Sequence, residues 1–261
     1  MSKLSKNPLK IQSMFSSIAP RYDLLNRLLS FGRDTYWRRF AVNQLPHIED
    51  GMFLDVATGT GDVAIEIVKH IPNSRVIGMD FSEEMLEMGR KKIIKKGCQK
   101  QIELHFGDIT YMPFKDKTFD AAIIAFGIRN ISDYRTGIGE MARVVKEGGK
   151  VVILEFTPLE RKPFTPLEKL SNGASPSFLT GFTSLQSRFL KFPFRLYLSK
   201  VLPVIGGIIS GRKGAYKYLS DSVLDFPNPD KLKKIMGETG LKEVKYYTLT
   251  SGIVAVHVGI K

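Results

Sequence analysis

The stretch at residues 53–62, Phe-Leu-Asp-Val-Ala-Thr-Gly-Thr-Gly-Asp, decides the fold class of this chain. A short apolar run breaks into small residues and two glycines, and the helical pattern of residues 63–68 follows. A strand, a glycine turn and a helix N-terminus in this order let the backbone approach a nucleotide closely. A second apolar run, 75–79, ends at Asp80 about twenty residues past the loop, where a carboxylate can accept hydrogen bonds from both ribose hydroxyls. The pattern predicts a site for a cofactor that contains adenosine.

The acids around the loop bear on which cofactor it binds. Gly59, Gly61 and Ala64 formally fit the dinucleotide pattern, so NAD stays open. Asp55 can order the loop and attract a cationic ligand, whereas Asp62, in the first turn of the helix, would repel a pyrophosphate. S-adenosylmethionine carries a sulfonium and an ammonium group and no pyrophosphate. The loop therefore favours S-adenosylmethionine over NAD.

Composition sets the class of protein. A chain of 261 residues with 43% hydrophobic and 25% charged residues is expected to form one domain, 1–261, with a full core. We expect no transmembrane span, because no apolar run approaches about eighteen residues, and no secretory signal, because the Lys-rich N-terminus lacks an apolar core. The single Cys98 is compatible with a reducing cytoplasm. Because the histidines also lack ligand spacing, no metal is expected.

The net charge of +13 calls for a partner or a reason. Nucleic acid, an anionic membrane surface and simple solubility are all open. In residues 161–217 many Lys and Arg alternate with Phe and Leu, which looks more like a lipid-facing surface than an RNA groove. Aromatic platforms for stacking bases stay open.

Apolar periodicity predicts an α/β fold over most of the chain. Strands are expected at 52–57, 75–80, 102–107, 119–125, 149–156, 241–249 and 253–260, and helices at 62–70, 82–96, 134–146 and 229–239. Glu147-Gly148-Gly149 is expected to end a helix, and Ser251-Gly252 to join a final hairpin. Strand–helix repeats build a parallel sheet. The first fifty residues, 1–50, read as an amphipathic helical cap, and residues 158–228 as a lid-like insertion.

Two longer strings carry a family resemblance. Residues 22–30, Tyr-Asp-Leu-Leu-Asn-Arg-Leu-Leu-Ser, followed by Trp37, and residues 143–157, Arg-Val-Val-Lys-Glu-Gly-Gly-Lys-Val-Val-Ile-Leu-Glu-Phe-Thr, resemble two signatures of the menaquinone/ubiquinone biosynthesis C-methyltransferase family. Further stretches are also similar to the family, at 126–130, 201–203, 215–219 and 252–259. The chain departs from the family pattern at Leu25, Asp34, Ala125, Glu147 and Thr157, and residues 158–200 are longer than usual.

The resemblance implies a class I S-adenosylmethionine-dependent methyltransferase, with a Rossmann-like, seven-stranded, mostly parallel sheet whose last strand is antiparallel. The implied reaction methylates a ring carbon of a demethylated, prenylated naphthoquinol in menaquinone biosynthesis. The form of residues 24–32 with Asp34 is more similar to the menaquinone-only branch. A ubiquinone-pathway methoxy-benzoquinol is the alternative acceptor.

Site residues follow from the motifs and the resemblance. Thr60 is expected near the amino-acid end of the cofactor, Asp80 on the ribose and Asp108 with Ile109 on the adenine. Gly59, Gly61, Asp55 and Ala125 complete the cofactor-binding set. Arg129 and Asn130, just after the fourth strand, are the expected catalytic residues, with an ion pair that secures the loop as the structural alternative. Tyr22, Asp34 and Tyr218 are candidates for the quinol pocket, and the general base is not assigned.

Rival functions remain at this stage. A nucleic-acid methyltransferase would share the fold and the charge, but no Asn/Asp-Pro-Pro-Tyr string occurs and no cysteine ends the fourth strand, so no nucleic-acid partner is expected. A non-catalytic member of a quinone-synthesis complex stays open because of Ala125 and the long 158–200 segment. We expect a cytoplasmic protein that contacts the inner face of the membrane, with a homodimer left open.

Overall fold

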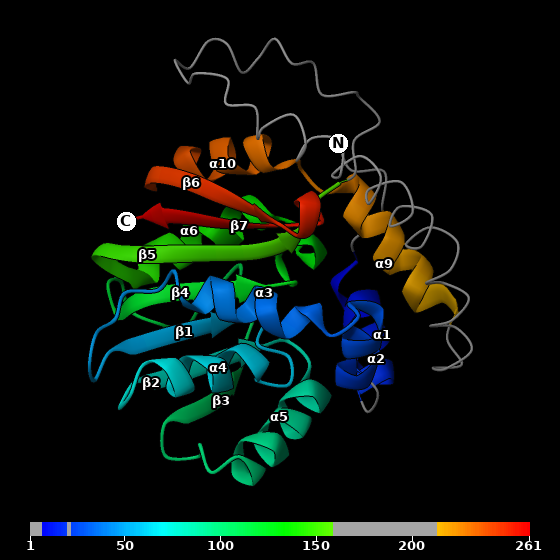
Figure 1. The fold of residues 1–261 in the computed structure, drawn as a ribbon, viewed down its shortest axis with the longest axis horizontal. Coiled ribbons are helices and arrows are strands. Elements are labelled where there is room, and N and C mark those ends of the chain that lie inside the picture. The colour runs from blue at the N-terminus through cyan, green and yellow to red at the C-terminus, as the bar shows by residue number, and fades with distance from the viewer. Residues whose placement is uncertain (1–6, 20–21, 159–212) are drawn as a thin grey trace, which may run out of the picture.

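A seven-stranded sheet forms the centre of the protein (Figure 1). The computed structural model describes residues 7–19, 22–158 and 213–261. The strands are β1 (Met52–Val56), β2 (Arg75–Asp80), β3 (Ile102–Phe106), β4 (Phe119–Ala125), β5 (Val145–Phe156), β6 (Lys242–Leu249) and β7 (Val254–Ile260). Their order is β3-β2-β1-β4-β5-β7-β6, and β7 is antiparallel to both of its neighbours. The predicted mostly parallel sheet with an antiparallel last strand is confirmed.

Helices cover both faces of this sheet and its carboxyl edge. They are α1 (Pro8–Ile18), α2 (Tyr22–Leu29), α3 (Arg33–Val42), α4 (Asp62–His70), α5 (Glu83–Lys95), α6 (Tyr134–Val144), α9 (Lys213–Asp225) and α10 (Pro229–Glu238), with short 3-10 turns η2 (Ile128–Asn130) and η5 (Thr250–Gly252). Figure 1 shows α1, α2 and α9 at the right, beyond one end of the strands. Helices α1, α2 and α3 lie in the region 1–50, and its part as a cap stays a prediction.

Two apolar layers result from the alternation of side chains along each strand. On β4, Ala121 and Ile123 pack into the layer under α3, α4 and α5, whereas Ala122 and Ile124 pack into the layer under α6 and α10. All four side chains are fully buried. Both faces of the sheet are therefore tightly packed, and this packing fixes the ends of the strands from which the loops at the carboxyl edge start.

The start of β5 differs from the prediction. The strand begins at Val145, which pairs with Phe119, and the next registered pair is Lys150 with Ala121. Gly148 has a φ of 76°, and a Cβ on Gly149 would lie 2.6 Å from the Asp120 carbonyl oxygen. Residues 147–149 thus form a bulge inside β5 and do not end a helix, because two glycines suit either role locally and the partner strand decides.

The N-terminal helices are tied to distant parts of the chain. The Trp37 indole is buried and its Nε1 donates to Thr250 Oγ1 at 2.8 Å, which joins α3 to the β6–β7 turn. Of the predicted lid, 158–228, only residue 158 and residues 213–228 are described, so its role stays a prediction. In the part of the chain that the structure describes, no helix is long and apolar enough to cross a membrane.

Candidate active site

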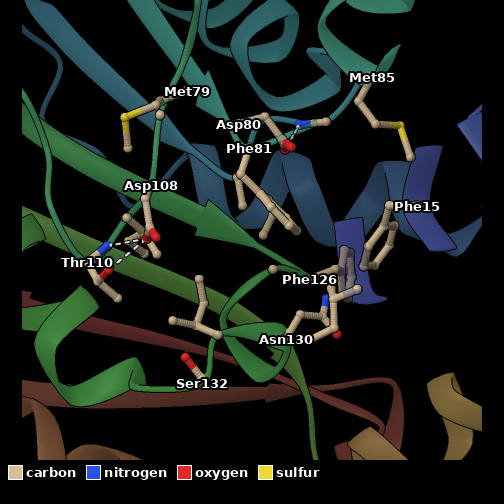
Figure 2. Close-up of a pocket in the computed structure, with 18 of the residues that line it drawn as sticks. Phe15, Met79, Asp80, Phe81, Met85, Asp108, Thr110, Phe126, Asn130 and Ser132 are labelled. Atoms are coloured by element: carbon tan, nitrogen blue, oxygen red, sulfur yellow. Dashed lines mark hydrogen bonds between the residues drawn. The ribbon is translucent and has the colours of Figure 1, made fainter. Parts of the chain in front are cut away.

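A pocket opens at the carboxyl edge of the sheet, where the order of strands reverses around β1 and β4 (Figure 2). This is the place where open α/β sheets bind ligands. Its floor comes from the loops after β1, β2, β3 and β4, and α1 and α2 add Ile11, Phe15 and Tyr22. The empty space around it is about 870 Å³, part of which is open to solvent.

The conformation of the glycine loop is held by glycine backbone angles and by the buried carboxylate of Asp55. Gly59 and Gly61 have φ of 57° and 80°, values that suit glycine. Oδ2 of the buried Asp55 accepts Thr58 Oγ1 at 2.6 Å and the Ala64 amide at 3.1 Å. Burial raises the pKa of Asp55 to about 7. Gly59 lines the pocket and Asp55 does not. Asp55 therefore orders the loop, as the sequence suggested.

Asp80 lies at the end of β2 and faces the pocket. Its Oδ2 accepts the Gly59 amide at 2.8 Å and its Oδ1 accepts the Ser82 amide at 3.0 Å. A carboxylate has about four acceptor positions, so each oxygen can still accept a ribose hydroxyl. Burial raises the pKa of Asp80 to about 6 although the amides favour the charged form.

The loop after β3 lines the opposite wall. Asp108 and Ile109 both line the pocket, and Asp108 Oδ1 accepts the amide and the hydroxyl of Thr110, each at 2.8 Å. Figure 2 shows this turn beside Met79. Ala125, at the end of β4, also lines the pocket. The structure thus brings together Gly59, Asp80, Asp108, Ile109 and Ala125, as predicted for cofactor contacts.

Several aromatic and apolar lining residues escaped the sequence analysis. Phe81 directly follows Asp80, and Phe126 directly follows β4. Phe126 has a φ of 59°, a conformation that costs about 1–3 kcal/mol and gathers at functional sites. Their position just after a strand was the available signal. Ile11 and Phe15 gave no local signal, because α1 reaches the pocket only through the tertiary fold.

Thr60 is not where the sequence placed it. Its hydroxyl donates to Asp23 Oδ1 at 2.6 Å and accepts from Lys92 Nζ at 2.7 Å, and it is absent from the pocket lining. Gly61, which is the N-cap of α4, is also absent from the pocket lining. The partners of Thr60 come from α2 and α5, which a local motif cannot reveal.

Arg129 forms the ion pair that was the structural alternative. Its guanidinium lies 2.6 Å from Glu155 Oε1, both side chains are at most 5% exposed, and Nη1 also donates to the Phe126 carbonyl at 2.7 Å. The guanidinium carbon is 5.5 Å from the Phe156 ring centroid. Arg129 does not line the pocket. The pair fixes the loop after β4 to β5.

Asn130 and Tyr22 do line the pocket, and Figure 2 places Asn130 in the turn after Phe126. The Asn130 Oδ1 atom is buried and accepts no hydrogen bond within the described residues. Burial raises the pKa of Tyr22, although Arg129 and Arg38 lie near enough to oppose the shift. Asn130 and Tyr22 therefore border the same space as the Asp80 carboxylate.

Two predicted quinol-pocket residues lie outside the lining. Asp34 is buried and pairs with Arg38 at 2.5 Å, so it braces α3. The Tyr218 hydroxyl on α9 is buried, with no hydrogen-bond partner in the described part of the chain. Burial raises the pKa of Tyr218, while Arg129 lowers it and Glu155 raises it, so the phenol lies close to this ion pair.

Comparison with known proteins gives the family. The model of the ubiE/COQ5 methyltransferase family matches residues 3–172 and 168–261. The chain belongs to this family. A relative from Geotalea uraniireducens, named ubiquinone/menaquinone biosynthesis C-methyltransferase UbiE, is 46% identical over the whole of both chains. The demethylmenaquinone methyltransferase of Thermus thermophilus is 42% identical over 94% of this chain and 99% of its own.

Solved structures agree on the fold. An S-adenosylmethionine-dependent methyltransferase from Aquifex aeolicus superposes with a TM-score of 0.59 at 15% identity, covering 91% of this chain and 97% of its own. A structure from Methanococcus maripaludis, titled a putative methyltransferase of the same kind, gives 0.61 at 16% identity, with 100% and 97% covered. Family and fold identify an S-adenosylmethionine-dependent methyltransferase, which removes the NAD interpretation. Among the described residues, no group of three or more His, Cys, Asp or Glu is placed to hold a metal.

Proposed function

We propose that this methyltransferase transfers the methyl group of S-adenosylmethionine to a ring carbon of a demethylated, prenylated naphthoquinol, the last step of menaquinone biosynthesis. The observation that carries the proposal is one continuous pocket lined by both acidic and neutral polar groups. Asp80 and Asp108 supply carboxylates at the ends of β2 and β3, and Tyr22 and Asn130 add neutral polar groups among apolar lining residues. Such a pocket suits a cationic nucleoside beside an aromatic acceptor.

For this reaction the protein mainly has to align the two reactants and exclude water from the site. A quinol ring carbon becomes nucleophilic when the neighbouring hydroxyl loses its proton. The carbon–methyl bond forms as the sulfur–methyl bond breaks, sulfur keeps the electron pair, and the methylated carbon then loses its proton to restore the ring. No covalent intermediate with the protein is needed. Alignment of the two reactants in a closed site supplies most of the acceleration.

Residues at the end of β4 are suited to the acceptor. Asn130 lines the pocket, and its amide can form a hydrogen bond with the quinol hydroxyl and so orient the ring. Arg129 lies within electrostatic reach of the Tyr22 phenol, and its positive charge favours a phenolate in the same region. Because Arg129 is held by Glu155, we assign it a positioning and electrostatic role and assign contact with the acceptor to Asn130.

Menaquinone is preferred over ubiquinone on two grounds. The form of residues 24–32 with Asp34, which stands where the family's quinone signature has His, is more similar to the menaquinone-only branch, and here the Asp34 carboxylate is part of the buried pair with Arg38. The Thermus and Deinococcus relatives, at 42% and 43% identity, are both named demethylmenaquinone methyltransferase. The Geotalea relative carries a name that covers both quinones, so the acceptor has to be decided by assay.

The test offers both acceptors to the wild-type protein. Labelled S-adenosylmethionine is incubated with a reduced demethylnaphthoquinol or with a demethylated methoxy-benzoquinol, and labelled product is counted. We expect turnover on the naphthoquinol and little on the benzoquinol. Turnover on the benzoquinol alone would move the assignment to the ubiquinone pathway. No turnover on either, with S-adenosylmethionine still bound, would favour the non-catalytic role.

We also propose that the protein works on the cytoplasmic side of the membrane and touches its surface, where a prenyl tail resides. The basic, aromatic segment 161–217 that suggested this lies mostly outside the described residues. Support comes from α2 and the start of α3, where Leu24, Phe31 and Tyr36 are 65%, 76% and 51% exposed beside Arg27 and Arg33. Apolar side chains with flanking cations bind anionic lipid surfaces.

Sedimentation with vesicles tests the contact. The wild type should bind vesicles that contain anionic lipid more than neutral ones, and Leu24→Ser with Phe31→Ser should weaken that binding. Ile94→Ser, at an equally exposed site on α5 (64%), is the matched control. Equal sedimentation with and without anionic vesicles would remove the proposal.

A further inference from the structure

Behind the glycine loop, Lys92 on α5 joins three elements. Its ammonium contacts Thr60 Oγ1 in the loop at 2.7 Å, Asp62 Oδ1 in the first turn of α4 at 2.7 Å, and the Asp23 carboxylate on α2. An ammonium has three N–H donors, so all three are used. No other side chain in the described residues links α2, α4, α5 and the loop in this way.

The contacts close into a ring. Thr60 Oγ1 accepts from Lys92 and donates its own proton to Asp23 Oδ1 at 2.6 Å, while Lys92 reaches Asp23 Oδ2. Both oxygens of Asp23 are therefore engaged, one by the loop and one by α5. The ring is partly shielded, since the side chains of Lys92 and Asp23 are 21% and 40% exposed.

The ring is electrically supported from α3. Arg38 Nη1 lies 3.4 Å from Asp62 Oδ2 and 2.5 Å from Asp34 Oδ2, and its side chain is 10% exposed. Although burial opposes ionisation of Asp62, Arg38 and Lys92 outweigh that effect and lower the pKa of Asp62. The negative charge of Asp62 is thus balanced by the positive charges of Arg38 and Lys92.

The hydrogen-bonded ring of Lys92, Thr60 and Asp23 fixes the position of Tyr22, the residue next to Asp23. Tyr22 is adjacent to Asp23 and lines the pocket. A Cβ built on Gly59 would lie 3.9 Å from Tyr22 Cε1, so the phenol ring sits over the glycine loop. The Phe15 ring of α1 packs edge-on against it at 6.1 Å. Tyr22, next to a member of the hydrogen-bonded ring, therefore covers the glycine loop, and Phe15 packs against Tyr22.

We propose that Lys92 is a positioning residue that holds α2, and with it Tyr22, closed over the cofactor, through its ring with Thr60 and Asp23. The cofactor then gains affinity from a cover that is already assembled, and opening the ring exposes it to exchange. This inference rests on the pocket being the S-adenosylmethionine site. In this proposal Thr60 links the glycine loop to α2 through its hydrogen bond to Asp23.

The test measures S-adenosylmethionine affinity and turnover in Lys92→Met and Asp23→Asn. Loss of a partly shielded ion pair and hydrogen bond should raise the Kd and KM for S-adenosylmethionine about 3- to 10-fold. At saturating cofactor the bound ligand restores the closed form, so kcat should stay within about twofold. Lys92→Arg, which keeps the charge, should recover most of the loss. Lys91→Met, on the exposed neighbouring position of α5, should behave as wild type.

A double variant separates this role from a general loss of stability. Because Lys92 and Asp23 act through one ring, Asp23→Asn should add less than about twofold to the Kd in a Lys92→Met background. Asp23→Asn alone, at the more exposed position, keeps the test open if Lys92→Met folds poorly. An unchanged KM in both single variants, or independent and multiplying effects in the double variant, would overturn the proposal. A wild-type protein that does not bind S-adenosylmethionine would instead overturn the site assignment itself.

Discussion

The two sides of the pocket are built differently. On the cofactor side, at the ends of β1 and β2, the carboxylates are held by hydrogen bonds within the protein: both Asp80 oxygens accept backbone amides, and Oδ2 of Asp55, behind the pocket, accepts two donors. On the acceptor side, at the ends of β4 and β5, Asn130 Oδ1 and Arg129 Nε are buried without a partner among the described residues.

This difference shows how the work is divided. The cofactor side is organised by hydrogen bonds within the protein, so its polar groups have fixed positions. On the acceptor side, Asn130 lines the pocket and Arg129 lies behind it. Buried polar atoms without partners cost free energy, so the loop after β4 is the less completely hydrogen-bonded part of the site.

The largest effect is expected on the acceptor side from loss of the buried ion pair. Glu155→Ala leaves the Arg129 charge buried without its partner and should cost about 3–5 kcal/mol in the free energy of unfolding, measured by urea denaturation. The exposed pair of Arg135 and Glu238, also 2.6 Å apart, is the matched control. Glu238→Ala should change stability little, and equal losses in the two variants would contradict the burial argument.

On the cofactor side, Asp55 should make stability depend on pH. Its folded pKa of about 7 lies above the unfolded value of 3.8, so the folded protein binds the extra proton and stability falls as the pH rises through this window. The slope approaches about 1.4 kcal/mol per pH unit. Asp55→Asn can keep an oxygen toward both donors and should remove that slope. Parallel stability curves for the two proteins would show that Asp55 does not titrate in this way.

Asp80→Ala should weaken cofactor binding strongly. Hydrogen bonds to a charged acceptor contribute about 1.5–3 kcal/mol, so the Kd for S-adenosylmethionine should rise about 10- to 100-fold by calorimetry. Asp108→Ala should weaken it less, because Asp108 Oδ1 already serves Thr110 and the side chain lies in an exposed turn. A larger effect at Asp108 would reverse the assigned roles.

The smallest effect is expected at Asn130. Asn130→Ala removes one oriented acceptor and should lower kcat about tenfold while leaving the Kd for S-adenosylmethionine unchanged. Asn43→Ala, an exposed amide at the end of α3, serves as the control for surface amides. A raised Kd with normal kcat would place Asn130 on the cofactor side of the comparison.

Predictability from sequence follows the same division. The cofactor side depends on neighbours in the chain, so the glycine loop, Asp80 and Asp108 could all be placed from strand ends and spacing. The seven-stranded, mostly parallel sheet and its antiparallel last strand were also predicted through the family resemblance. The bulge at residues 147–149 was not, because its glycines act against the β4 partner strand.

Side-chain direction was the part that the sequence could not determine. Thr60 stands in the predicted loop but points to Lys92, and Arg129 stands after the predicted strand but is held by Glu155. Both partners come from elements that are distant in the chain. Motif spacing places a Cα near a site, whereas long-range charge pairing decides where the functional group goes.

The most direct test of the central claim, methyl transfer to a quinol ring carbon, is to locate an isotopically labelled methyl group in the product. Wild-type protein is given labelled S-adenosylmethionine and reduced demethylnaphthoquinol, and carbon NMR of the purified product identifies the attachment atom. The account predicts a single labelled methyl group on the ring carbon. A labelled methyl ether on a quinol oxygen, or unmodified quinol in the presence of bound cofactor, would contradict it.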